Sequence, residues 1–162
     1  MKKPLVFKGQ EICCSWAFEQ QAWDEGHGEV GGADEVGRGA LCGPVVAAVV
    51  ILGKGFDADG LDDSKRLTER QRETLAERIR PRARAWCLGV AEPGEVDRLN
   101  ILRATYLALR PAVEGLAQPP DLLLVDALII PGVPVKQKAI VKGDALSYSI
   151  AAASVLAKVD RD

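Results

Sequence analysis

The sequence predicts an α/β protein in which helices flank a central, mixed, five-stranded sheet. Segments with strand-like and helical patterns alternate along the chain. Two early β-rich runs are separated only by the turn "GRGA", which predicts an antiparallel hairpin. Further along, "DLLLVDAL" contains a continuous apolar run, which is typical of a central strand buried on both faces. The early strands should therefore form an antiparallel meander within a sheet of mixed strand direction.

The first half of the chain is expected to contain a short helix, two strands and a longer helix. The short helix fits "SWAFEQQAW", within an otherwise weakly periodic opening segment. The strands occupy residues 30–36 and 41–52, on either side of the glycine turn. In "LTERQRETLAERIR", apolar residues recur at helical spacing on a charged background. This pattern predicts a helix over residues 67–80 that Pro81 ends.

The second half should supply three strands and two helices. "RAWCLGVA" predicts the third strand. Apolar residues at helical spacing in "GEVDRLNILRATYLALRPAVEGL" predict one long helix, bent near Pro111, that packs on the sheet. The fourth and fifth strands follow at residues 121–128 and 135–141. The alanine-rich stretch "DALSYSIAAASVLAKVDRD" predicts a final helix.

Composition indicates a single globular domain and excludes several classes of protein. The 162 residues are 48% hydrophobic and 27% charged, which are globular values. The formal net charge of -2 neither requires nor excludes a polyanionic partner. Four cysteines without a C-x-x-C motif, together with the single His27, argue against a zinc site. Because no signal peptide or membrane-length apolar run is visible, we expect a reduced cytoplasmic protein with no membrane partner.

Four acidic residues stand where the core of a sheet or helix should be apolar: Asp34, Glu35, Asp126 and Asp144. Asp126 follows the apolar run, at the carboxyl end of a strand, where α/β sheets place ligands. If the strands that carry Asp34 and Asp126 are neighbours, their carboxylates converge at one end of the sheet. Such a cluster is too costly unless cations neutralise it.

Hard divalent cations are the natural partners of such carboxylates, so the cluster predicts bound Mg²⁺ or Mn²⁺. Two ions about 3.5 to 4 Å apart would form the clamp of phosphoryl-transfer enzymes, and this favours phosphodiester hydrolysis. Other interpretations exist for the individual acids. Asp144 could be an ordinary helix N-cap, and Asp34 with Glu35 could form an exposed edge of a turn. A P-loop NTPase is excluded, because G-x-x-x-x-G-K-[ST] does not occur.

Five stretches of the sequence resemble bacterial ribonuclease HII, the type 2 ribonuclease H family. They run in family order from about residue 29 to the end: "GADEVGRGALCGPVVAAVVIL", "LDDSKRLT", "EVDRLNILRAT", "PPDLLLVDAL" and "KAIVKGDALSYSIAAASVLAKVDRD". The resemblance implies a ribonuclease H-like fold. It also implies an endonuclease that cuts the RNA strand of RNA/DNA hybrids and cuts at ribonucleotides embedded in duplex DNA. We expect the protein to be a monomer. The products would carry a 5′-phosphate and a 3′-hydroxyl.

The resemblance also implies roles for particular residues. The family's catalytic, metal-binding acids correspond to Asp34, Glu35, Asp126 and Asp144, with two divalent ions per site and Asp34 touching both. The family's substrate-binding residues correspond to Gly37, Arg38, Gly39, Ser64 and Lys65. The backbone of the G-R-G motif would recognise the ribonucleotide 2′-hydroxyl, since glycine lets a main chain approach a sugar closely. Taken alone, G-R-G would be a hairpin turn. Ser64 and Lys65 would contact phosphate.

The end of the chain departs from the family pattern. The sequence stops at "KVDRD", before the family's further helical segment with a tyrosine that packs against the ribonucleotide sugar. We therefore expect residues 1–28 to be an N-terminal extension and residues 29–162 to be a catalytic domain truncated at its carboxyl end. Such a form should keep the fold and the metal but cleave single embedded ribonucleotides poorly.

Three alternatives to this function stay open from the sequence. One is a catalytically impaired remnant that only binds hybrids, favoured by the missing tyrosine segment and disfavoured by the intact acids. A second is the type 3 enzyme, whose substrate-binding domain does not fit within the residues ahead of the first motif. The third is another nuclease or a transposase-like member of the same fold, against which the G-R-G and "DSK" motifs argue.

Overall fold

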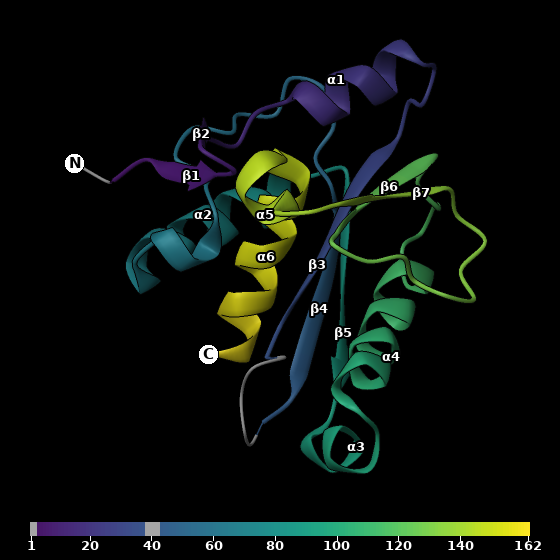
Figure 1. The fold of residues 1–162 in the computed structure, drawn as a ribbon. Coiled ribbons are helices and arrows are strands. Elements are labelled where there is room, and N and C mark those ends of the chain that lie inside the picture. Colours follow the sequence, from purple (N-terminus) through teal and green to yellow (C-terminus); the bar gives the residue numbers. More distant parts are fainter. Residues whose placement is uncertain (1–2, 38–42) are drawn as a thin grey trace.

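A computed structural model describes residues 3–37 and 43–162, with the backbone alone at 97–98. Its main sheet has the strand order β5-β4-β3-β6-β7 (Figure 1). The strands are β3 (Val30–Val36), β4 (Val45–Ile51), β5 (Ala85–Ala91), β6 (Leu122–Asp126) and β7 (Gln137–Ile140). Strands β3, β4 and β5 pair antiparallel, whereas β6 and β7 continue parallel to β3. The expected mixed five-stranded sheet is therefore confirmed.

Helices cover both faces of this sheet, as Figure 1 shows. The helices are α1 (Ala17–Asp24), α2 (Glu69–Arg82), α3 (Pro93–Arg98), α4 (Ile101–Glu114), α5 (Gly143–Leu146) and α6 (Tyr148–Arg161). Alternate residues of a strand point to opposite faces, and all of β4 is buried. Its residues Val46, Ala48 and Val50 pack with α2 and α6. The intervening β4 residues pack with α4 on the other face, so α6 and α4 enclose the sheet.

Helix α6 lies unusually close to β3. A Cβ atom added at Gly32 would lie 2.2 Å from the carbonyl carbon of Ser149 and 2.4 Å from the nitrogen of Ile150. No side chain fits there, so the glycine of β3 lets the first turn of α6 rest directly on the strand. This contact fixes the amino-terminal end of α6 against the strand that carries Asp34.

The long helix expected over residues 94–116 is wrong, because the structure has two helices there. Leu99 and Asn100 adopt extended conformations between α3 and α4. The Asn100 side chain accepts a hydrogen bond from the backbone N–H of Arg103 at 2.9 Å, so Asn100 is the N-cap of α4. Pro111 lies inside α4. The helical spacing of apolar residues continues across the break between α3 and α4, so it does not reveal the break. The Asn100 cap determines where α4 begins.

The final helix is also interrupted. Ser147 has φ -115° and ψ 127°, which ends α5 and begins α6, and its side chain accepts a hydrogen bond from the N–H of Ile150. Helix α2 runs through Pro81 to Arg82, two residues beyond the predicted end at Arg80, because the helical hydrogen bond from the N–H of Ala83 to the carbonyl of Ile79 still forms at 2.8 Å. Three short elements were not expected: the hairpin of β1 (Leu5–Phe7) and β2 (Gln10–Ile12), and the 3₁₀ turn η1 (Ser64–Arg66).

Within the described ranges, no helix is both long and apolar enough to cross a bilayer.

Candidate active site

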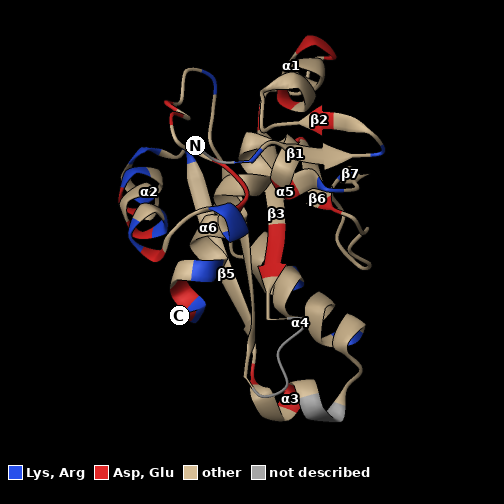
Figure 2. Ribbon diagram, turned by 60° about the vertical axis from the view of Figure 1, so that its left-hand side comes forward, with Lys and Arg blue, Asp and Glu red and all other residues tan. Residues whose placement is uncertain are grey.

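Three acidic side chains from separate segments meet beside the carboxyl-terminal ends of two inner strands of the main sheet. Asp34 lies on β3 and Asp126 ends β6, and these strands are parallel neighbours with Ala33 opposite Val125. Asp144 reaches the same place from α5. Each of the three offers a carboxylate oxygen, and these oxygens lie within 4.8 Å of one another. In the view of Figure 2, the acidic segment of β3 lies near the centre, and the charged residues of α2 lie at the left-hand side.

Backbone hydrogen bonds fix the orientation of two of these carboxylates. The Asp34 Oδ1 atom accepts a hydrogen bond from the N–H of Glu35 at 2.8 Å. The Asp126 Oδ1 atom accepts one from the N–H of Gly143 at 2.9 Å. The second bond ties the end of β6 to the first residue of α5. Asp126 and Asp144 therefore have a defined relative position that the backbone of α5 maintains.

Glu35, the fourth predicted acid, lies outside this group of three. Successive strand residues point to opposite faces, so its side chain starts from the other face of β3. Its carboxyl group lines the same cleft as Asp34, and its charge acts on Asp34. The structure thus separates the predicted set into a tight group of three and one neighbour.

The three clustered carboxyl groups are difficult to ionise together. Burial raises the pKa of Asp34 well above its ordinary value of 3.8, and the charge of Asp126 raises it further. Burial also raises the pKa of Asp126, against the effect of its backbone hydrogen bonds. The pKa of Asp144 is raised to about 6 by burial and then by the charges of Asp126 and Asp63. Two full charges about 5 Å apart repel by roughly 3 kcal/mol at an effective dielectric constant of about 20.

A divalent cation is the partner that such a cluster fits. Bound positive charge would cancel the repulsion and favour the ionised form of each carboxyl group. Among the described residues that line the cleft, none carries an imidazole or a thiol, and the available side-chain ligands are carboxylate and hydroxyl oxygens. Oxygen ligands of this kind suit Mg²⁺ and Mn²⁺. The donor set therefore fits the ions expected from the sequence.

The three acids lie in a cleft of about 360 Å³. The residues that line it are Asp34, Glu35, Val36, Gly37, Ser64, Lys65, Asp126, Asp144, Ser154 and Lys158. Lys65 lies at its rim, with 82% of its side chain exposed and its Nζ atom 3.8 Å from the Asp144 Oδ2 atom. Asp63 begins the turn that carries it, since the Asp63 Oδ1 atom accepts a hydrogen bond from the N–H of Lys65. The cleft thus combines buried negative charge with an exposed amine.

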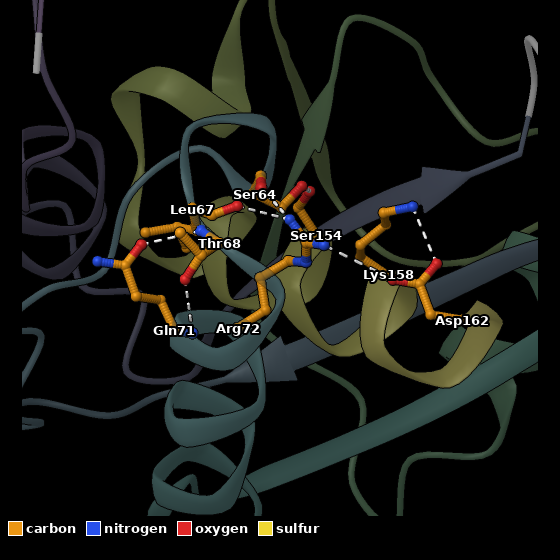
Figure 3. A network of polar contacts seen from close by, with 8 residues as sticks. All are labelled: Ser64, Leu67, Thr68, Gln71, Arg72, Ser154, Lys158 and Asp162. Carbon is orange, nitrogen blue, oxygen red and sulfur yellow. Dashed lines mark hydrogen bonds and ion pairs between the residues drawn. The ribbon is translucent and has the colours of Figure 1, made fainter.

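Two polar lining residues, Ser154 and Lys158, were not predicted from the sequence. They lie four residues apart on α6, a spacing that puts both on one face of the helix. This spacing was the one sequence feature that could have indicated them. The Ser154 hydroxyl is hydrogen-bonded to the Ser64 hydroxyl at 2.7 Å, and Lys158 pairs with Asp162 at 2.9 Å (Figure 3). Arg72 joins the same network. Its guanidinium donates to the carbonyl of Ser64 and pairs with Asp162, which connects α2 with the end of α6.

Only part of the G-R-G motif can be placed. Gly37 lines the cleft with φ at 109°, and a Cβ atom there would lie 2.5 Å from the Pro44 carbonyl oxygen. Glycine is therefore required at this position both by conformation and by space. The predicted residues Arg38 and Gly39 lie outside the described residues.

Comparison with known proteins identifies the relatives of this chain. The family model for Ribonuclease HII matches residues 31–162. Ribonuclease HII of Myxococcus xanthus is 53% identical over 156 residues, which are 96% of this chain and 53% of that protein. Ribonuclease HII of Desulfitobacterium hafniense (strain DCB-2) is 55% identical over 144 residues, which are 89% of this chain and 55% of that protein. The chain therefore spans about half the length of the curated relatives it matches.

Solved structures agree with this relationship. Ribonuclease H2 from Pyrococcus horikoshii has a TM-score of 0.72 and 29% identity, over 83% of this chain and 72% of that one. RNase HII from Archaeoglobus fulgidus, solved in complex with PCNA, has a TM-score of 0.62 and 28% identity, over 82% of this chain and 71% of that one. The resemblance seen in the sequence motifs and the expected ribonuclease H-like fold are both confirmed.

Proposed function

This chain belongs to the ribonuclease HII family, and on that premise we propose that it is a metal-dependent endoribonuclease. Its substrates would be RNA/DNA hybrids and duplex DNA with embedded ribonucleotides. Hydrolysis would leave a 5′-phosphate and a 3′-hydroxyl. The observation that carries the proposal is the convergence of the Asp34, Asp126 and Asp144 carboxylates within 4.8 Å in a cleft. A buried cluster of this kind serves little purpose in a protein that binds no cation.

The proposed catalytic residues are the four acids. Asp34, Asp126 and Asp144 would hold two Mg²⁺ or Mn²⁺ ions, and Glu35 would complete the ligand set from the same cleft. Such ions polarise the scissile phosphate and make the attacking water more acidic. The hydrogen bond from Gly143 to Asp126 supports this role, because it keeps the carboxylate oriented before any ion binds.

The residues around the acids would bind and select the substrate. Lys65 carries positive charge at the cleft rim, where a phosphate of the nucleic acid would approach the acids. Ser64 lies in the same turn, with its hydroxyl held by Ser154. Gly37, with the following Arg38 and Gly39, would bring backbone groups close to the 2′-hydroxyl, the group that distinguishes RNA from DNA.

A cleavage assay on the 162-residue chain tests this proposal. Two labelled duplexes, one an RNA/DNA hybrid and one a DNA duplex with a single ribonucleotide, are incubated with Mg²⁺, Mn²⁺ or EDTA. We expect metal-dependent cutting that Asp34→Asn abolishes. Glu73→Gln, which changes an exposed acid on α2, should leave cutting unchanged. Binding of the hybrid without any cutting would instead indicate the hybrid-binding remnant, and absence of both would contradict either function.

A further inference from the structure

A short N-terminal segment, residues 14–19, lies against the turn that carries Asp144. It precedes the part of the chain that the family model matches. The Cys14 thiol donates a hydrogen bond to the carbonyl oxygen of Asp144 at 3.4 Å. The N–H of Ser15 donates to the carbonyl of Leu146 at 3.1 Å, and the carbonyl of Ser15 accepts from the N–H of Tyr148 at 3.3 Å. The segment therefore follows the α5–α6 connection as an added strand would.

Glu19 makes the most unusual contact of this segment. Its side chain is completely buried, although it lies on α1. Its Oε2 atom accepts hydrogen bonds from the Ser147 hydroxyl and from the N–H of Ser149, both at 2.9 Å. Its Oε1 atom has no hydrogen-bond partner among the described residues. Burying a carboxylate in this way is costly, although the positive end of the α6 dipole offsets part of the cost.

The hydrogen bonds of Glu19 limit how far the α5–α6 connection, and with it Asp144, can move. The first turn of α6 cannot shift toward β3, because Gly32 already touches the backbone of Ser149 and Ile150. The other end of α5 is held by the bond from Gly143 to Asp126. Ser147 connects α5 with α6, between these two contacts. Glu19 accepts hydrogen bonds from the Ser147 hydroxyl and from the backbone N–H of Ser149. Without Glu19, the backbone at Ser147 could rotate, and this rotation would move Asp144 away from Asp34 and Asp126.

We propose that residues 14–19 position Asp144 for metal binding and that Glu19 is the principal positioning residue. This inference rests on the proposed function, because it concerns the same metal site. It assigns the N-terminal segment a role in the site itself. For this positioning role, the location of the Glu19 Oε2 atom matters more than the negative charge of the side chain.

Two variants separate position from charge. Glu19→Gln keeps the chain length, so its amide oxygen can still accept both hydrogen bonds. Glu19→Asp keeps the charge but withdraws the oxygen by one methylene. Ala22→Gly is the matched control, because it weakens α1 at another buried position without touching Ser147 or Ser149. For each folded protein, the Mn²⁺ dissociation constant is measured by calorimetry and the amide exchange of residues 144–149 is measured without metal.

We expect Glu19→Asp to bind Mn²⁺ about 10-fold more weakly and to exchange its 144–149 amides faster, as loss of an outer contact to a metal ligand typically does. Glu19→Gln and Ala22→Gly should stay within about 3-fold of the unmodified chain. Equal affinities in all four proteins would overturn the inference and leave the proposed function intact. A weakened Glu19→Gln beside an unchanged Glu19→Asp would overturn it as well. Absence of Mn²⁺ binding by the unmodified chain would overturn the proposed metal site itself.

Discussion

At the scale of single residues, the carboxyl cluster costs the metal-free protein stability. Asp144 is buried beside Asp126 and Asp63, and its pKa is raised to about 6 from an ordinary 3.8. The folded state therefore holds a proton that the unfolded state has already released between these values. The nearby Lys65 amine, 3.8 Å from Asp144, opposes the shift without removing it. The arrangement of the cluster thus favours cation binding and lowers the stability of the metal-free protein.

This shift predicts how stability depends on pH. Without metal, the contribution of Asp144 is fully present below pH 3.8 and is lost as the pH rises through about 6. The loss should amount to roughly 3 kcal/mol in the free energy of unfolding. Asp144→Asn should reduce this dependence, because its side chain does not titrate. Urea unfolding in EDTA at several pH values measures the effect. A difference between the two proteins that stays constant from pH 4 to pH 7 would contradict it.

The clustered acids were the easiest part of the candidate site to predict from the sequence. Acids that interrupt apolar runs are conspicuous, and three of the four, Asp34, Asp126 and Asp144, do lie together. The position of Glu35 followed less directly, since adjacency in the sequence places two side chains on opposite faces of a strand. Ser154 and Lys158 were missed because each stands between an alanine and a valine on α6, and an isolated polar residue of a helix is usually only a solvent-facing one.

At the scale of secondary structure, close packing between α6 and β3 depends on Gly32. An added methyl group would lie 2.2 Å from backbone atoms, which cannot move aside as a flexible side chain would. We expect Gly32→Ala to lower the free energy of unfolding by about 3 kcal/mol or more. Gly94→Ala is the control, because nothing lies within 4 Å of its added Cβ and it should be neutral or slightly stabilising. Chemical denaturation measures both, and equal stabilities for the two variants would contradict the packing argument.

The strands of the main sheet were predictable, but the helix breaks were not. Strand patterns are local, so residues 30–36 were found with the bounds that β3 has. The helical pattern around Asn100 continues on both sides of the break, and only the side-chain cap to Arg103 reveals it. At the break before α6, the Ser147 side chain caps the N–H of Ile150 and also donates a hydrogen bond to Glu19, 128 positions away, a contact that no local pattern includes.

At the scale of the whole molecule, the site is assembled from segments that are far apart in the sequence. Asp34, Asp126 and Asp144 come from a strand, a strand end and a short helix, and residues 14–19 lie behind the last of these. Such a site exists only when the sheet and the helices are folded together. Ions that bind it must therefore bind the native state in preference to the unfolded chain, and this links metal affinity to global stability.

This link predicts that metal raises the melting temperature. At a free Mg²⁺ or Mn²⁺ concentration about 100 times the dissociation constant, the native state should gain about 2.7 kcal/mol for one ion. For a domain of this size, that gain corresponds to an increase of roughly 5 to 10 °C. Asp126→Asn should lose most of the increase, because it removes a charged ligand while its side-chain oxygen can still accept the hydrogen bond from Gly143. Glu73→Gln, which changes an exposed residue of α2, should keep the increase.

Calorimetric melting with metal and with EDTA makes the comparison. An equal increase in Asp126→Asn and in the unmodified chain would place the bound ion elsewhere on the surface. If Asp126→Asn instead melts higher than the unmodified chain in EDTA and gains little from metal, the result agrees with the cluster geometry. Repulsion among the carboxylates, whose oxygens lie within 4.8 Å of one another, then destabilises the metal-free protein, and a bound cation removes this destabilisation.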